Sequence, residues 1–314
     1  MSVLLDPREA HCRIPSEQGL TLFLRHLAPR SEAKGAVLYV HGATFPSALS
    51  IAHRFDGRSW RDELCDAGFH VWGFDFLGYG ESDNYPAMSE PPEGCAPLCG
   101  AEDASRQIER VVRFISEHHG GARVAVIAHS WGTVAACCLA ARCPELVDRL
   151  VLFGPIARRE GADVRQVPAW RLVSLEDQWQ RFTAEVPGGE PAVLSRRHFD
   201  DWGERYLDSD ATSRTRAPAS VKTPGGPLYD IVRAWAGDLA YDPAQVPAPV
   251  AIIRGEWDSL CTDADAAWLF ERFASPIRRD VKISRGTHLM HLEASRYALY
   301  RETDAFLLGG DDAV

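Results

Sequence analysis

The chain has 314 residues, 46% of them hydrophobic and 25% charged, which is the composition of an ordinary water-soluble globular protein. Its formal net charge of −10 excludes a surface built to bind nucleic acid, because phosphates are neutralised by an excess of Lys and Arg. The length suits one large domain, or one domain that carries an insertion.

The start of the chain does not have the pattern of a signal peptide, since three apolar residues are followed at once by charges. No apolar run approaches the roughly 18 residues that cross a membrane. The eight cysteines include no matched pair of C-x-x-C motifs. We therefore expect a cytoplasmic protein with reduced thiols that acts on a small-molecule substrate and has no nucleic-acid or membrane partner. The sequence gives no indication of the oligomeric state.

Strand and helix patterns alternate through the first half of the chain. A loose alternation over 9–28 predicts an antiparallel pair of strands at a sheet edge. Four apolar runs predict buried strands: 36–40, 69–76, 124–128 and 150–153. Helices are predicted between them: 60–67, a segment from Ile108 to about 118, and 133–141. This order predicts an α/β fold, a mostly parallel central sheet with helices on both faces.

The alternation breaks after Pro155 and resumes near Pro247. This stretch is too long for a connecting loop, and it shows no strand pattern. Its many aromatic residues argue against a disordered linker, so we predict short helices near 170–185, 191–208 and 227–237. The resulting prediction is a core of residues 1–154 and 248–314 with an inserted, mainly helical cap of residues 155–247. Three cap tryptophans are candidates for contacts with a substrate: Trp170, Trp179 and Trp202.

The core pattern then continues to the end of the chain. Strands are predicted over 250–254 and 281–284, and helices over 263–273 and 292–307.

The central stretch 124–134, VAVIAHSWGTV, turns from a strand into a helix within about one residue. So sharp a turn needs small residues two positions before and after its apex, and Ala128 and Gly132 supply them. The apex residue, Ser130, is then forced into strained backbone geometry, with its hydroxyl exposed at the N-terminus of a helix. We interpret Ser130 as a nucleophile, and the alternative is an ordinary helix N-cap.

A serine nucleophile needs a base and an acid, and both have candidates on loops that follow predicted strands. His288 could accept the Ser130 proton on one ring nitrogen and donate from the other to Asp258. The three residues occur along the chain in the order that accompanies such a sharp turn. A metal pair of His288 with His291 lacks further ligands at matching spacing. Three other carboxylates compete for the place of Asp258: Glu256, Asp263 and Asp265.

Two backbone amides are candidates for an oxyanion hole, which acyl transfer also requires. Trp131 follows the nucleophile directly, and Ala43 lies on the loop after the strand 36–40. The His41 side chain on the same loop is interpreted as structural.

Five segments, in this order, carry a resemblance to a known family: VHGATF, FDFLGYGESD, AHSWGT, RGEWDS and SRGTHLMHLE. They resemble the landmark segments of the α/β-hydrolase superfamily over residues 20–307, the cap excepted. The resemblance implies a Ser130–Asp258–His288 triad, an oxyanion hole at Ala43 and Trp131, no cofactor, and a cap that shapes the substrate pocket. From the spacing of the histidines we also expect no metal. Epoxide hydrolases and haloalkane dehalogenases of this superfamily are similar too, but they use an aspartate nucleophile, so Ser130 disfavours both.

The predicted reaction is hydrolysis of a carboxylic ester, lactone or thioester of a small-to-medium apolar or aromatic substrate, through an acyl-Ser130 intermediate. Similar superfamily members leave a carbon–carbon bond hydrolase, a proline-iminopeptidase-like amidase and an acyltransferase or cyclase as alternatives. A non-catalytic ligand-binding protein with the same pocket is another. The cap residues Arg171 and Arg205 could hold a substrate carboxylate, although we expect solvated roles for both.

Overall fold

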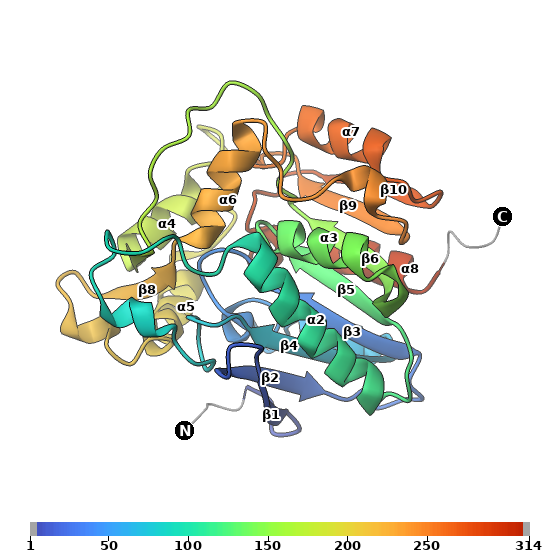
Figure 1. The fold of residues 1–314 in the computed structure, drawn as a ribbon. Coiled ribbons are helices and arrows are strands. Elements are labelled where there is room, and N and C mark those ends of the chain that lie inside the picture. Colours follow the sequence, from blue (N-terminus) through green and yellow to red (C-terminus); the bar gives the residue numbers. More distant parts are fainter. Residues whose placement is uncertain (1–4, 310–314) are drawn as a thin grey trace.

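A central sheet of eight strands runs through the structure, a computed structural model that describes residues 5–309 (Figure 1). The strand order is β1-β2-β4-β3-β5-β6-β9-β10; β2 is antiparallel to both of its neighbours, and the pairs from β4 to β10 are parallel. The predicted α/β fold is confirmed, and the positions 1–4 and 310–314 of the predicted core lie outside the described residues. The strands are β1 (Ala10–Pro15), β2 (Thr21–Leu27), β3 (Gly35–Val40), β4 (Phe69–Asp75), β5 (Val124–His129), β6 (Val147–Phe153), β9 (Val250–Gly255) and β10 (Arg278–Ile283).

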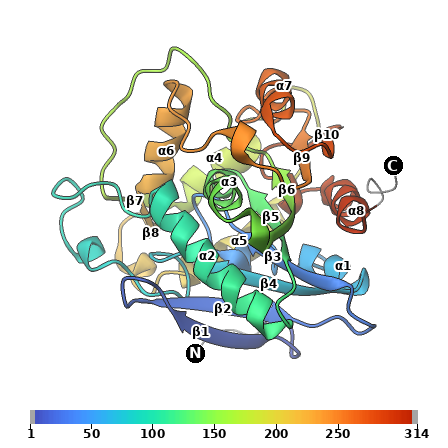
Figure 2. The ribbon, with the colours of Figure 1, turned by 45° about the vertical axis from the view of Figure 1, so that its right-hand side comes forward.

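Helices cover both faces of this sheet (Figures 1 and 2). Side chains alternate between the faces along each strand, so Leu38 and Val40 of β3 pack with one group of helices, and Val37 and Tyr39 with the other. One face carries α2 (Ala101–His118), α3 (Gly132–Arg142) and α7 (Asp263–Arg272), and the other carries α1 (Trp60–Asp66) and α8 (Arg296–Leu307). Burial on both sides explains why the central strands read as continuous apolar runs.

The boundaries of four predicted core elements differ from the prediction. α2 begins at Ala101 rather than at Ile108, because its first two turns carry mostly polar residues. The apolar run predicted a strand from residue 150, but β6 begins at Val147. Asp148 and Arg149 interrupt the apolar pattern and not the strand itself. β10 begins at Arg278 because an edge strand tolerates charged side chains. The last helix, α8, begins only at Arg296, after a short 3-10 turn over Met290–Leu292.

The segment 155–247, which we call the cap, lies beside the carboxyl ends of the parallel strands, at the left in Figure 1. Its three predicted helices are present as α4 (Leu175–Thr183), α5 (Arg196–Asp208) and α6 (Gly226–Trp235). The expectation that it holds no strand is wrong: β7 (Trp170–Ser174) pairs antiparallel with β8 (Ser220–Pro224). These two strands are short and distant in sequence, so their pairing leaves little local pattern to read.

The remaining expectations at this level concern membranes and thiols. Within residues 5–309, no helix combines the length and the apolar character that a membrane crossing needs. All eight cysteines are free thiols.

Candidate active site

The turn between β5 and α3 has the strained geometry that the sequence predicts. Ser130 has a φ of +56°, which is rare for a residue with a side chain, and its backbone N–H donates to the oxygen of Phe153 at 2.9 Å. A Cβ at Gly132 would lie 2.4 Å from the backbone oxygen of His41, so only glycine fits there. Ala128, two positions before the apex, is fully buried. The turn therefore lets β5 and α3 pass closely and leaves the Ser130 hydroxyl at its tip.

Three side chains from distant parts of the chain meet at this tip. The Ser130 Oγ lies 2.7 Å from Nε2 of His288. The Nδ1 of the same ring lies 2.9 Å and 3.0 Å from the two carboxylate oxygens of Asp258. All three residues are buried. The structure thus brings together the predicted hydroxyl, imidazole and carboxylate with hydrogen-bonding distances at both junctions.

The acid and the base are each held by backbone contacts. Oδ1 of Asp258 accepts hydrogen bonds from the amides of Leu260 and Cys261, both at 2.9 Å. The ring of His129 lies 2.9 Å from the backbone oxygen of His288, with Nε2 as the donor. These contacts fix the His288 ring against the carboxylate from two sides.

A cap residue that the sequence analysis did not single out joins the loops of the acid and the base. Oε2 of Glu185 accepts the backbone N–H of His288 at 2.7 Å. Oε1 accepts the backbone N–H of Ser259 at 2.9 Å and the hydroxyl of the same residue. No local motif marks Glu185, because its partners lie in loops far along the chain. Glu185 therefore ties the cap to the loops of Asp258 and His288.

The three competing carboxylates have other partners. Glu256 accepts the backbone N–H of Arg285, and Asp263 pairs with Arg254 and Lys282. Asp265 closes a capping box with Thr262 and forms an ion pair with Arg159. Asp258 is the carboxylate that contacts His288.

The two predicted oxyanion amides flank the nucleophile. The Ala43 loop is held by the Tyr79 hydroxyl, which donates to the backbone oxygen of Ala43 at 2.8 Å. The Trp131 ring is held by Asp230 of α6, whose Oδ2 accepts its indole N–H at 2.8 Å and the backbone N–H of Ala101 at 2.7 Å. Within residues 5–309, neither the Ala43 nor the Trp131 amide donates a hydrogen bond, so both are available for a ligand oxygen. Burial raises the pKa of Asp230 to about 6.

His41 has the structural role expected of it. Its Nδ1 donates to the oxygen of Gly42 at 2.8 Å, and its Nε2 accepts the backbone N–H of Phe76 at 3.1 Å. Burial lowers the pKa of this ring, so it is neutral and links the ends of β3 and β4.

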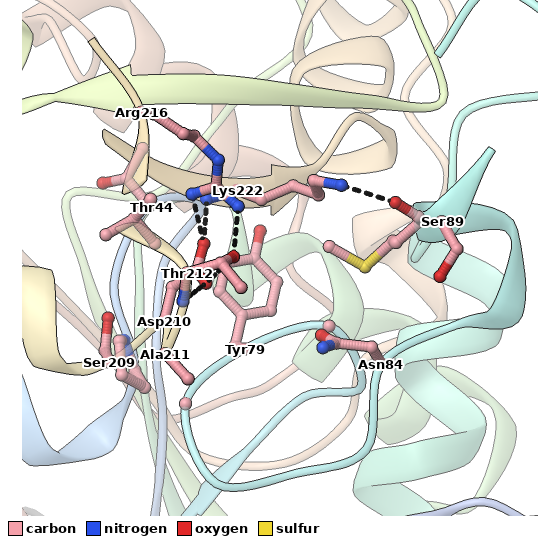
Figure 3. A pocket seen from close by; sticks show the side chains of 15 residues that line it. Thr44, Tyr79, Asn84, Ser89, Ser209, Asp210, Ala211, Thr212, Arg216 and Lys222 are labelled. Carbon is pink, nitrogen blue, oxygen red and sulfur yellow. Dashed lines mark hydrogen bonds and ion pairs between the residues drawn. The ribbon is translucent and has the colours of Figure 1, made fainter. Parts of the chain in front are cut away.

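The cavity that touches Ser130 has a volume of about 10 Å³, room for one water molecule. Its lining includes the Ala43 loop and a cap side chain, Arg181. A larger cavity of about 380 Å³ lies between β8 and the loop after β4 (Figure 3), and it shares Thr44 with the small one. The cap is therefore closed over Ser130.

The three candidate tryptophans do not line the cavity beside Ser130. Trp202 is fully buried, stacks on Tyr206 and donates its indole N–H to the oxygen of Leu49. Trp179 packs edge-on against Phe199, and Trp170 lies under the Lys222 ammonium. These tryptophans therefore pack within the cap or against the core.

A group of histidines within the described residues could reach a common metal ion: His26, His70 and His119. Nε2 of His26 lies 3.0 Å from Nδ1 of His70, and His119 accepts the indole N–H of Trp72. Burial and their mutual repulsion lower the pKa of His26 to about 3. His70 lies at the start of β4, so this group lies at the amino ends of the parallel strands, whereas Ser130 lies at their carboxyl ends. The histidine group is therefore remote from the candidate site.

Comparison with known proteins identifies a matching family and similar proteins. The sequence model of the family described as alpha/beta hydrolase fold matches residues 35–295. A homoserine O-acetyltransferase of Deinococcus radiodurans is 28% identical over 257 residues, which are 76% of this chain and 70% of the relative.

Solved structures share the fold. An E-2-(acetamidomethylene)succinate hydrolase superposes with a TM-score of 0.62 at 19% identity, covering 96% of this chain and all of the other. A monoacylglycerol lipase of Paleococcus ferrophilus gives 0.58 at 19% identity, covering 91% and 98%. At such low identity these two likenesses concern the fold alone.

Proposed function

The chain belongs to the alpha/beta hydrolase fold family, and from this we propose that it is a serine hydrolase that cleaves a carboxylic ester, lactone or thioester. The observation that carries the proposal is the continuous contact from Ser130 through His288 to Asp258, at 2.7 Å and 2.9 Å. A serine that served only as a helix N-cap would have no need of this buried pair.

The proposed reaction has two halves. In the first, Ser130 Oγ attacks the acyl carbon while its proton passes to His288 Nε2, and His288 then gives this proton to the departing alcohol or thiol. In the second, His288 takes a proton from water, the hydroxide attacks the acyl-Ser130 ester, and the acid leaves as Ser130 recovers its proton. Asp258 accepts the Nδ1–H throughout and stabilises the imidazolium that forms in each half.

The Ala43 and Trp131 amides are proposed to stabilise the negative charge on the acyl oxygen in both halves. An amide on the nucleophile's own helix and one on the first loop can point at a common oxygen without reorganisation. Removal of one such donor typically costs about 10²–10³-fold in kcat.

A second candidate is an acyltransferase, which the similarity to the homoserine O-acetyltransferase favours. The first half would be unchanged, and an alcohol or amine would replace water in the second. Turnover of p-nitrophenyl acetate with and without candidate acceptors separates the two. Stoichiometric free acid in every case supports the hydrolase, whereas acylated acceptor formed in place of acid supports the transferase.

The proposed nucleophile is tested with a fluorophosphonate followed by mass spectrometry. We expect an adduct on Ser130 in the wild type, a greatly slowed reaction in His288→Ala, and an unchanged rate in His118→Ala, a control at an exposed histidine on the far edge of the sheet. An unreactive Ser130 in folded wild-type protein would instead support a non-catalytic, ligand-binding role.

A further inference from the structure

Arg181 of α4 lines the cavity that touches Ser130, yet its guanidinium has no hydrogen-bond or ion-pair partner among residues 5–309. Its Nε is buried without an acceptor. Burial lowers the pKa of Arg181, which reflects the cost of keeping this charge away from water. Arg181 as a whole is half-buried, and the described residues leave its buried Nε without an acceptor, so an anionic ligand in the cavity would supply one.

A second arginine, Arg171 of β7, lies close to Arg181 and likewise has a buried Nε without an acceptor. It makes no hydrogen bond or ion pair with the described residues. Its charge is near enough to disfavour that of Arg181. Gln178, one helical turn before Arg181, is buried with both amide atoms unpartnered. The underside of the cap thus gathers two cations and an amide that lack partners.

The acids near these arginines are engaged elsewhere. Glu185 accepts three hydrogen bonds from the loops of the acid and the base. Asp177 closes the capping box of α4 with Ser174. Glu185 attracts the charge of Arg181 and Asp177 that of Arg171, but neither carboxylate comes within ion-pair distance of its arginine.

The two cations that line the larger cavity, by contrast, are paired. In the larger cavity, Arg216 pairs with Asp210, and the Lys222 ammonium donates to the oxygen of Met88 at 2.6 Å (Figure 3). The cations of the larger cavity are thus paired, whereas Arg181 beside Ser130 and its neighbour Arg171 have no partner among the described residues.

We propose that Arg181 and Arg171 form a carboxylate-binding subsite of the active site, so that the substrate is an ester, lactone or thioester that also carries a carboxylate. A guanidinium presents two parallel N–H groups that match the two oxygens of a carboxylate. This inference rests on the proposed function, because it supplies the charge that selects a substrate for Ser130. It also replaces the expectation of a solvated Arg171.

The size of the cavity adds a condition. About 10 Å³ does not admit a carboxylate and an acyl chain, so substrate entry requires α4 to move away from Ser130. Ser174 ends β7 and caps α4, so Arg171 and Arg181 lie on one continuous segment. A movement of this segment carries both arginines together and keeps the subsite intact.

The experiment compares substrates that differ in charge but not in length. p-Nitrophenyl hydrogen adipate and p-nitrophenyl hexanoate place a carboxylate or a methyl group at the end of the same six-carbon acyl chain. 4-Carboxyphenyl acetate and its methyl ester do the same for the leaving group. We expect the wild type to prefer the anionic member of one pair, and that pair shows on which side of the scissile bond the carboxylate lies.

The decisive variant is Arg181→Gln. We expect kcat/KM for the preferred anionic substrate to fall about 10- to 100-fold, mainly through KM, because a charge-assisted hydrogen bond is lost. The neutral partner should change less than about threefold. Arg197→Gln, at an exposed arginine of α5 in the same cap, is the matched control and should change neither. An equal loss on both members of each pair, or the absence of any anionic preference, would overturn the subsite.

Two further measurements keep this result separate from the proposed function. Labelling of Ser130 by a neutral fluorophosphonate should proceed at similar rates in the wild type and in Arg181→Gln, which shows that the nucleophile is intact. If the wild type is not labelled, the proposed function fails, and the subsite is decided by binding alone. Adipate should then raise the melting temperature of the wild type and raise that of Arg181→Gln much less; equal shifts would refute the subsite.

Discussion

Gly154 lies directly beneath the acid and the base, and its replacement by alanine tests the geometry of the site without removing any reactive group. A Cβ at this position would lie 2.9 Å from Oδ2 of Asp258 and 2.9 Å from Nδ1 of His288. Ordinary contacts of a Cβ begin near 3.4 Å, so the pair must shift by about 0.5 Å. Because a displacement of about 1 Å in a catalytic group costs about 10²-fold, we expect kcat to fall about 10- to 100-fold.

The same substitution strains the backbone, and a control separates this effect. Gly154 has a φ of +54°, and an alanine there costs about 1–2 kcal/mol of stability. Gly120 has a φ of +72° with nothing within 4 Å of a built Cβ, so Gly120→Ala carries the strain without the clash. Steady-state turnover of p-nitrophenyl esters and thermal unfolding should show both variants destabilised and only Gly154→Ala slowed. Wild-type kcat in Gly154→Ala would refute the proposal that this His288–Asp258 arrangement is the working one.

Three further predictions follow from contacts in the site. Asp258→Asn should lower kcat about 10³–10⁴-fold with little change in KM, because the amide no longer stabilises the imidazolium of His288; a loss below about tenfold in steady-state assays would argue for another acid. Glu185→Ala should lower the melting temperature and lower kcat by about tenfold, since the loops of the acid and the base lose their shared acceptor; unchanged values would show that this contact carries no energy. Asp230 has a pKa of about 6 in the fold against 3.8, so its contribution to stability is fully present below about pH 4 and is lost as the pH rises through 6. Asp230→Asn should therefore match the wild type in urea unfolding at pH 4 and exceed it by about 1–3 kcal/mol at pH 8, and an equal difference at both pH values would contradict the burial argument.

The fold and the sharp turn at Ser130 follow from patterns that are local in the sequence. Buried parallel strands are continuous apolar runs, and a sharp strand-to-helix turn needs small residues at fixed offsets, as at Ala128 and Gly132. Both signals lie within a dozen residues. Asp258 and His288 are predicted from the loops that follow the last two strands. The structure separates Asp258 from its competitors because each competitor contacts another partner.

The parts that could not be predicted depend on contacts between distant segments. Glu185 is 103 residues from His288 and 74 from Ser259 along the chain, and no periodicity records such a contact. The pairing of β7 with β8 is equally remote. The composition shows how many tryptophans the cap contains. It does not show whether Trp202 faces a ligand or the interior of the cap.

The hydrogen bonds of Glu185 couple movement of the cap to the positions of the His288 and Asp258 loops. This residue lies just beyond α4, so the displacement that admits a substrate also pulls on the backbone of His288 and on the loop of Asp258. If the cap moves away, His288 loses the hydrogen bond from its backbone N–H to Glu185, and it regains this bond when the cap closes. Under the proposed function, closure of the cap and the placement of the His288 ring would therefore occur together.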